Sequence, residues 1–326
     1  MTKFQKPKRL IIIDANSIIH RAFHALPSLK SKKGKHTGAV YGFLLVLFKA
    51  IRELRPDFIC ASFDTPGSTF RHKKFKEYKA KRPPTPKEIS TQIPTVKEIL
   101  QAFKIPSFET QGFEADDIIG TVATLAPRRQ VFPEIETVIL SGDQDLLQLI
   151  NNKTKVFTLR KGVKETMLYG QDEVQKKYGI SPQQIIDFKG LRGDPSDNIP
   201  GVTGIGKKTT QLLLQKFGTL ENLYKELEES SKKAQGLKPK LRKLLLDYKE
   251  QAFLSKNLAT IKKDAPIEFN LKKCSWGKYD DGEVLDKLKE LGFKSLMKRL
   301  PELEEQKKKT KAKETTPSQK ENLRLW

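Results

Sequence analysis

The sequence predicts an α/β protein with a parallel-stranded central sheet and flanking helices. Short apolar runs rich in β-branched and aromatic residues occur at 10–13, 58–63 and 137–140, and such runs are typical of buried parallel strands. Helix-like segments at 37–54, 87–103 and 115–125 alternate with them. Beyond about residue 170 the strand signals end and Lys-rich helical periodicity continues, so a second, helical region is expected.

Acidic residues follow each predicted strand at its carboxyl end. Asp14 and Asp64 come directly after the first two runs, and Asp143 follows the third after a Ser-Gly pair. The carboxyl ends of strands in an open α/β sheet line one crevice, so we expect these side chains to converge. Further acids accompany them in short clusters at Glu114, Asp116, Asp117, Asp145, Asp194 and Asp197.

Nine acids grouped in this way need positive compensation, because closely packed carboxylates raise one another's pKa. Hard divalent cations prefer oxygen ligands, which indicates Mg²⁺. Two such ions about 3.5–4 Å apart can activate water and stabilise the leaving oxygen in phosphoryl displacement. Taken singly, the same acids are equally typical of helix N-termini and turns.

Composition narrows the class of protein. The chain has 326 residues, about two domains, and its 62 Lys and Arg against 39 Asp and Glu give a net charge of +23. This balance favours a polyanionic partner, nucleic acid before an anionic membrane surface. Cys60 and Cys274 are too few for a disulfide framework or a four-thiolate zinc site, and they predict a reduced, cytoplasmic protein. No apolar run approaches the roughly 20 residues of a membrane span.

A basic segment near residues 70–88 has the composition of a nucleic-acid contact. It combines Arg71, Lys79 and Arg82 with Phe70, Phe75 and Tyr78. Aromatic rings can stack on bases while cations follow phosphates. The alternative is a solvated basic helix whose aromatic side chains face the core.

A glycine-rich turn precedes the helix-like segment at 207–217. Its members are Gly201, Gly204, Gly206, Lys207, Lys208 and Thr209. Backbone amides at a helix N-terminus form a natural phosphate seat. The turn is not a Walker A loop, because Lys208 stands where Ser or Thr is required. It resembles a helix-hairpin-helix clamp for the DNA backbone.

Taken in order, these motifs resemble the 5′-nuclease domain of bacterial DNA polymerase I, in the flap endonuclease family. They run from Ile-Asp14-Ala-Asn-Ser and Phe-Asp64-Thr-Pro through Tyr78-Lys79-Ala-Lys-Arg82-Pro-Pro, Glu114-Ala-Asp116-Asp117, Ser-Gly-Asp143-Gln-Asp145 and Gly-Asp194-Pro-Ser-Asp197-Asn to Gly-Val-Thr-Gly-Ile-Gly. The resemblance implies a PIN-like fold and a helical arch at about 70–100. It also implies a helix–three-turn–helix element that often holds K⁺.

The resemblance also implies two metal-ligand groups. The first would be Asp14, Asp64, Glu114 and Asp116, with Asp117 alongside, and the second Asp143, Asp145, Asp194 and Asp197. Lys79, Arg82 and Asp116 would be catalytic, and Arg71 and Tyr78 would join Lys79, Arg82 and the glycine-rich turn in binding DNA. Two Mg²⁺ ions, replaceable by Mn²⁺, would serve the reaction.

The implied activity is a structure-selective 5′-3′ exonuclease and flap endonuclease acting on nicked, gapped or flapped DNA and RNA primers in replication and repair. The resemblance implies a monomer in the bacterial cytoplasm, at the nucleoid, with a separate DNA polymerase as a partner. Two alternatives stay open: a non-catalytic DNA-binding module and a ribonuclease of the PIN-type fold.

The expected domains are a catalytic domain at 1–170, a helical DNA-binding region at 171–300 and a basic tail at 301–326. The tail's Lys, Thr, Glu and Ser content predicts disorder. Since the chain stops after this tail, we expect a freestanding nuclease or one half of a split polymerase I.

Overall fold

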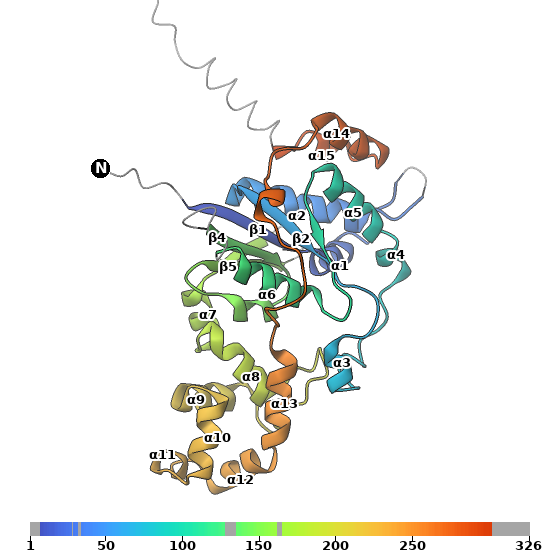
Figure 1. Ribbon diagram of the computed structural model, residues 1–326. Helices are drawn as coiled ribbons and strands as arrows, with labels where there is room; N and C mark the ends of the chain where they lie inside the picture. Colours follow the sequence, from blue (N-terminus) through green and yellow to red (C-terminus); the bar gives the residue numbers. More distant parts are fainter. Residues whose placement is uncertain (1–6, 28, 32–33, 128–134, 162–164, 302–326) are drawn as a thin grey trace, which may run out of the picture.

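A mixed six-stranded sheet lies at the centre of the computed structural model, which describes residues 7–27, 29–31, 34–127, 135–161 and 165–301 (Figure 1). Its spatial order is β3-β2-β1-β4-β5-β6. The strands are β1 (Lys8–Asp14), β2 (Phe58–Ser62), β3 (Ser107–Phe108), β4 (Ile135–Ser141), β5 (Thr154–Lys161) and β6 (Glu165–Tyr169).

The predicted parallel pairing is confirmed for every neighbouring pair except β5 and β6, which pair antiparallel. Only residues 162–164 separate these two strands in sequence, too few for the crossover that parallel strands need. The sequence patterns at 10–13, 58–63 and 137–140 correspond to β1, β2 and β4, whereas β3, β5 and β6 were not predicted.

Both faces of the sheet are covered, and the alternating side chains of β1 show the two cores. Ile11 and Ile13 pack into one core, while Leu10 and Ile12 pack into the other. The first core includes α1 (Ala15–Ala25), α2 (Gly38–Leu54) and α5 (Ile93–Ala102), and the second includes α6 (Ala115–Leu125) and the 3-10 helix η1 (Asp145–Leu149). The predicted α/β class with flanking helices is therefore confirmed.

The segment predicted as a helical arch, residues 70–100, is helical only in parts. Two short helices, α3 (Phe70–Lys74) and α4 (Lys87–Ser90), stand on either side of turns and irregular backbone at 75–86. The last part of the segment belongs to α5, whose Val96, Ile99 and Leu100 are buried in the first core. Ile89 of α4 packs into the same core, and of the residues 70–100 only Lys79 and Arg82 line the pocket described below.

A separate core made by helices lies below the sheet in Figure 1. Its largest buried side chain is Tyr224, whose hydroxyl donates to the Leu245 carbonyl at 3.0 Å. The elements are α7 (Gln171–Tyr178), η2 (Pro182–Gln184), α8 (Ile185–Arg192), α9 (Lys207–Phe217), α10 (Leu220–Glu228), α11 (Lys232–Gln235), α12 (Pro239–Asp247) and α13 (Lys249–Ala259). A non-helical Tyr248 divides the predicted segment 238–251 between α12 and α13.

After α13 the chain returns to the sheet. It forms η3 (Leu271–Cys274), α14 (Asp281–Glu290) and α15 (Lys294–Met297), and Ser275 makes a β-bridge to Phe58. Val284, Leu288 and Leu296 pack into the first core beside α2 and α5. The expected region 171–300 therefore consists of a helical part up to Ala259 and a returning part that packs on the α/β domain.

The predicted basic tail lies outside the described residues apart from Pro301. Among the residues that the structure describes, no helix is both long and apolar enough to cross a bilayer.

Candidate active site

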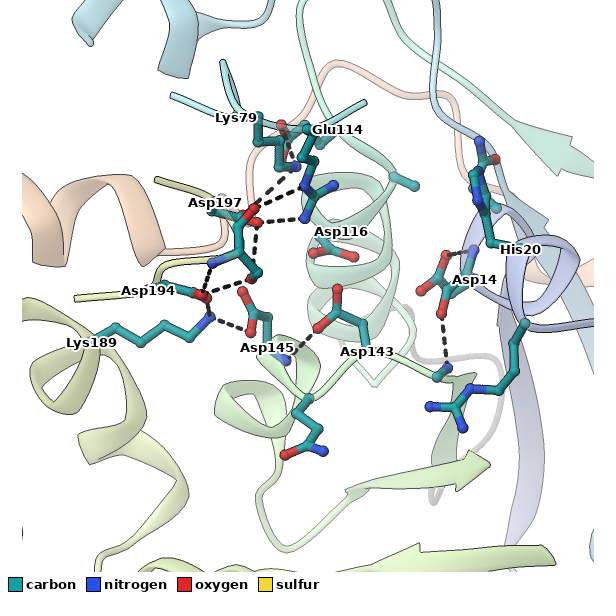
Figure 2. Close-up of a pocket in the computed structure, with 18 of the residues that line it drawn as sticks. Asp14, His20, Lys79, Glu114, Asp116, Asp143, Asp145, Lys189, Asp194 and Asp197 are labelled. Atoms are coloured by element: carbon teal, nitrogen blue, oxygen red, sulfur yellow. Dashed lines mark hydrogen bonds and ion pairs between the residues drawn. The ribbon is translucent and has the colours of Figure 1, made fainter. Parts of the chain in front are cut away.

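A pocket of about 890 Å³ opens at the carboxyl ends of β1, β2 and β4, between the sheet and the helical region. It brings together eight of the nine carboxylates predicted as metal ligands (Figure 2). They are Asp14, Asp64, Glu114, Asp116, Asp143, Asp145, Asp194 and Asp197. The last two come from the loop after α8, so the helical region completes the site.

Asp14 ends β1 and caps α1, so the strand and the helix meet at its side chain. One carboxylate oxygen accepts a hydrogen bond from the Ser17 amide at 3.2 Å, and the other accepts from Ser141 Oγ at 2.5 Å. Beyond β4, Asp143 Oδ1 accepts from the Asp145 amide at 2.8 Å. Neutral donors therefore position Asp14 and Asp143.

Helix α6 presents an acidic N-terminus to the pocket. Glu114 is its N-cap residue, Asp116 lies in its first turn, and the Ala115 amide donates to Asp64 Oδ1 at 2.8 Å. The positive end of the helix dipole favours carboxylates at this position. These acids therefore stand at a helix N-terminus, as one interpretation of the sequence expected, and they also line the pocket.

Two cations of the 75–86 segment reach the pocket acids (Figure 2). Lys79 Nζ lies 2.9 Å from Glu114 Oε1 and 3.9 Å from Asp197 Oδ2. Arg82 forms an ion pair with Asp197, and the Lys79 amide donates to the Asp197 carbonyl at 2.8 Å. Lys79 thus connects an acid of the first predicted ligand group with an acid of the second.

A third cation, Lys189 of α8, lies between Asp145 and Asp194. Its ammonium contacts Asp145 and lies 2.6 Å from Asp194 Oδ2. Ser196 donates to the other oxygen of Asp194 from its amide at 2.9 Å and from Oγ at 2.7 Å. Burial raises the pKa of Asp194, but Lys189 and Ser196 outweigh that effect and bring it to about 2.

Burial, with a smaller effect of neighbouring acids, raises the pKa of other carboxylates in the pocket. Burial, together with the charge of Asp143, raises the pKa of Asp14 to about 7 despite the Ser141 hydrogen bond. Burial and the charge of Asp143 also raise the pKa of Asp116. Acids held together at this cost are stabilised by bound cations, and a set of oxygen donors matches a hard divalent ion.

Within the described ranges, no three histidine, cysteine or acidic side chains form a preformed metal cage. Lys79, Arg82 and Lys189 already contact carboxylate oxygens that a metal would use. Mg²⁺ typically keeps several waters and takes only one or two carboxylates, so it does not require a closed cage. The donor chemistry of the pocket therefore fits a divalent ion, although the side chains are not arranged around one.

Asp117 is the one predicted metal ligand that lies outside the pocket. It is fully buried, and its two oxygens accept from the Arg71 guanidinium at 2.7 and 2.8 Å. The Glu114 amide at 3.1 Å and the Lys262 amide at 2.8 Å also donate to it. Protein donors surround this carboxylate, which corrects the prediction: Asp117 is a structural counter-ion for Arg71.

The same contacts correct the prediction that Arg71 binds DNA. Arg71 is 2% exposed, and its guanidinium also donates to the Leu258 and Thr260 carbonyls, at 2.9 Å each. Burial lowers the pKa of Arg71, but the charge and hydrogen bonds of Asp117 outweigh it and raise the pKa above its usual value. Arg71 therefore connects α3 to α6 and to the C-terminal end of α13.

Tyr78 differs from expectation in a similar way. Its side chain is buried, and its hydroxyl lies 3.2 Å from Glu114 Oε2 and 3.1 Å from Asp197 Oδ2. The ring packs edge-on against His72, with Lys79 Nζ 5.0 Å from its centre. The ring is covered by protein in this structure, which corrects the prediction that it presents a face to DNA bases.

The glycine-rich turn lies where the backbone demands glycine. Gly201 and Gly204 have φ values of 63° and 87°, and a Cβ on Gly201 would lie 2.1 Å from the Gly193 nitrogen. Gly206 caps the 11-residue helix α9. The turn exposes Gly204, Gly206, Lys207 and Lys208, with Thr209 partly exposed. These cations and free amides are therefore accessible to a phosphate.

Sequence reasoning missed the polar face of α1. His20, Arg21 and His24 line the pocket, and burial lowers the pKa of His20. His24 follows Arg21 by three residues and His20 by four, a helical period that places the three side chains on one side of α1, and this signal was available. Lys189 was also missed, and its partner Asp145 is too distant in sequence to give a local signal.

Two family models match the chain. One, described as the N-terminal resolvase-like domain of 5′-3′ exonuclease, matches residues 9–179, and the other, described as its C-terminal SAM fold, matches residues 180–282. DNA polymerase I of Bacillus subtilis strain 168 is 44% identical over 90% of this chain and 32% of its own length. DNA polymerase I of Bacillus caldotenax is 43% identical over 92% of this chain and 33% of its own. The chain spans about a third of the length of these relatives.

Solved structures share the fold. The zinc-bound T5 5′-exonuclease has a TM-score of 0.62 at 21% identity and covers 86% of this chain and 99% of its own. The catalytic core of Rad2 in complex with DNA substrate has a TM-score of 0.53 at 18% identity and covers 88% of both chains. The two family models together span both the α/β domain and the helical region, and the chain therefore belongs to the 5′-3′ exonuclease family found in DNA polymerase I.

Proposed function

We propose that this chain is a structure-selective 5′-3′ exonuclease and flap endonuclease that hydrolyses phosphodiester bonds near the 5′ ends of nicked, gapped or flapped DNA. The observation that carries the proposal is the gathering of eight carboxylates with Lys79 and Arg82 in one pocket. Oxygen donors can hold divalent ions, and fixed cations stabilise charge that develops on a phosphate.

Two divalent ions, Mg²⁺ with Mn²⁺ as a substitute, complete the proposed site. The zinc reported in the T5 5′-exonuclease structure supports metal binding by this fold. The proposed first ligand group is Asp14, Asp64, Glu114 and Asp116, and the second is Asp143, Asp145, Asp194 and Asp197. When bound, such ions lower the pKa of a water molecule and stabilise the leaving oxygen.

The chain's own residues bind and orient the phosphate. Lys79 and Arg82 are held by Glu114 and Asp197 in this structure. Once those acids have another cation to neutralise them, the ammonium and guanidinium groups can turn to the non-bridging oxygens of the scissile phosphate. Asp14, held by Ser17 and Ser141, keeps its oxygens in a fixed direction at the end of β1.

The turn before α9 is the proposed grip on the duplex. Lys207 and Lys208 are exposed beside the free amides at the N-terminus of α9, a combination that suits contact with the DNA backbone. K⁺ bound by carbonyls of this turn, RNA primers as substrates, a separate DNA polymerase as partner and a place at the bacterial nucleoid are further parts of the proposal. The Rad2 core in complex with DNA substrate and the net charge of +23 support a DNA substrate.

A labelled 5′-flap substrate tests the proposal directly. The chain should cleave the flap near its junction with Mg²⁺ and lose this activity in EDTA. Asp116→Asn should abolish cleavage while leaving duplex affinity intact, whereas Asp247→Asn, at an exposed position on α12, should behave as wild type. Binding without cleavage by the unaltered chain would identify a non-catalytic DNA-binding module. Cleavage of RNA in preference to flapped DNA would identify a ribonuclease.

A further inference from the structure

The pocket acids differ in the kind of group that contacts their carboxylates. Neutral hydrogen-bond donors position Asp14 and Asp143. Asp145 and Asp194 instead share the ammonium of Lys189, which contacts Asp145 and lies 2.6 Å from Asp194 Oδ2. Half of the proposed second ligand group is therefore paired with this single lysine, while Asp197 of the same group pairs with Arg82.

Lys189 makes these contacts from a largely buried position. Its side chain is 12% exposed, so its contacts are only weakly screened by solvent. The ammonium of Lys189 therefore lies as a protein cation between the two carboxylates.

The location of Lys189 links the two parts of the molecule. Asp145 begins η1 in the α/β domain, whereas Lys189 lies on α8 and Asp194 in the loop that follows it. Figure 2 shows the lysine entering from α8 with its ammonium directed at both acids. Lys189 contacts one oxygen of each acid, and Ser196 donates to the other oxygen of Asp194. A divalent ion bound by both Asp145 and Asp194 would therefore have to share their oxygens with this ammonium or lie beside its positive charge.

We propose that Lys189 is the resident counter-ion of the second ligand group. It holds Asp145 and Asp194 together before metal binds, and it competes with a divalent ion for their oxygens. This inference rests on the metal-binding part of the proposed function. It assigns Lys189 as a positioning residue that sets the affinity of the second group for its ion.

Lys189→Met is the informative substitution, because methionine keeps most of the aliphatic stem and removes the charge. Without metal, two buried carboxylates then face each other uncompensated, so the thermal unfolding temperature should fall in EDTA. With Mn²⁺ present, the ion no longer competes with an ammonium. Its affinity for the weaker site should then rise about tenfold or more.

The experiment is a Mn²⁺ titration of the full chain without DNA, followed by the electron paramagnetic resonance signal of free Mn²⁺. Lys189→Arg should bind Mn²⁺ as the wild type does, because the guanidinium restores the charge. Lys177→Met is the matched control, because Lys177 is a neighbouring lysine with neutral partners, Gln144 and Tyr169, at 3.1 and 3.2 Å. It should leave Mn²⁺ affinity unchanged.

Equal Mn²⁺ affinity in Lys189→Met and wild type would overturn the inference while leaving the proposed nuclease activity intact. If no variant bound Mn²⁺, the metal-binding part of the proposed function would fail as well. A Lys189→Met chain that folds only with Mn²⁺ supports the role, whereas one that stays unfolded with Mn²⁺ contradicts it. Lys189→Gln repeats the measurement with a polar neutral side chain.

Discussion

Arg71→Met should destabilise the folded chain by about 3–5 kcal/mol, because it leaves one partner of a buried ion pair uncompensated. Asp117 is fully buried and receives two hydrogen bonds from Arg71, at 2.7 and 2.8 Å. Methionine has a similar volume but no charge, so the main loss is the positive partner of Asp117. The Leu258 and Thr260 carbonyls also lose their donor, which adds to the cost.

Urea unfolding followed by circular dichroism measures this loss. Lys97→Met is the control, because the Lys97–Glu109 pair is 2.5 Å long but 38% and 49% exposed, and such pairs contribute about 0–1 kcal/mol. The double variant Arg71→Met, Asp117→Leu should cost less than the sum of the two single changes, since it leaves no buried charge. A cost below about 1 kcal/mol for Arg71→Met, or strict additivity, would refute the reasoning.

Three further predictions concern the glycine-rich turn, pH and salt. Gly201→Ala should destabilise the chain and weaken duplex binding, because φ is 63° and the new Cβ would lie 2.1 Å from a backbone nitrogen; Gly206→Ala, with no atom within 4 Å, should be tolerated. Burial raises the pKa of Asp14 and of Asp145 from the usual carboxyl range to about 7, which favours the protonated form in the folded state. In EDTA, the contribution of these two groups to the free energy of unfolding should therefore be greatest below about pH 4 and fall as the pH rises to about 7. Thermal unfolding scans across this pH window measure the fall. Lys208→Ala should lower duplex affinity and reduce the slope of log affinity against log salt by about 1, as measured by fluorescence anisotropy.

Contrary outcomes for these three are equally definite. Equal stability of the two alanine variants would remove the steric argument for the turn. A melting temperature that rose from pH 4 to pH 7 in EDTA would contradict the raised pKa values. An unchanged salt slope for Lys208→Ala would show that this lysine contacts no phosphate.

The sequence predicted the pocket better than its surroundings. Asp14, Asp64 and Asp143 could be placed together because parallel strands end at one edge, a rule that needs no knowledge of side-chain packing. The strand β5 was missed because polar residues interrupt its apolar pattern, and β6 because its apolar run, at 167–169, is shorter than the runs of about four or more residues that indicate a buried strand. Element order could therefore be derived for the centre of the sheet and not for its edges.

The sequence could not predict which cationic and aromatic side chains are buried and which reach the pocket. Arg71 and Lys79 belong to the same basic segment, yet Arg71 is buried on Asp117 and Lys79 reaches the pocket. The difference depends on partners distant in sequence, such as Leu258 for Arg71. Local composition describes the segment's charge but does not determine which side chain turns inward.

The helical region between Gln171 and Ala259 has a topological consequence. The chain enters it from β6 and later returns to the sheet, so it is an insertion within the α/β domain with both ends anchored. The two chain connections between the helical region and the α/β domain allow fewer relative rotations of these parts than a single linker would. The double connection should therefore keep Asp194 and Asp197, which come from the inserted side, in place against the strand-end acids.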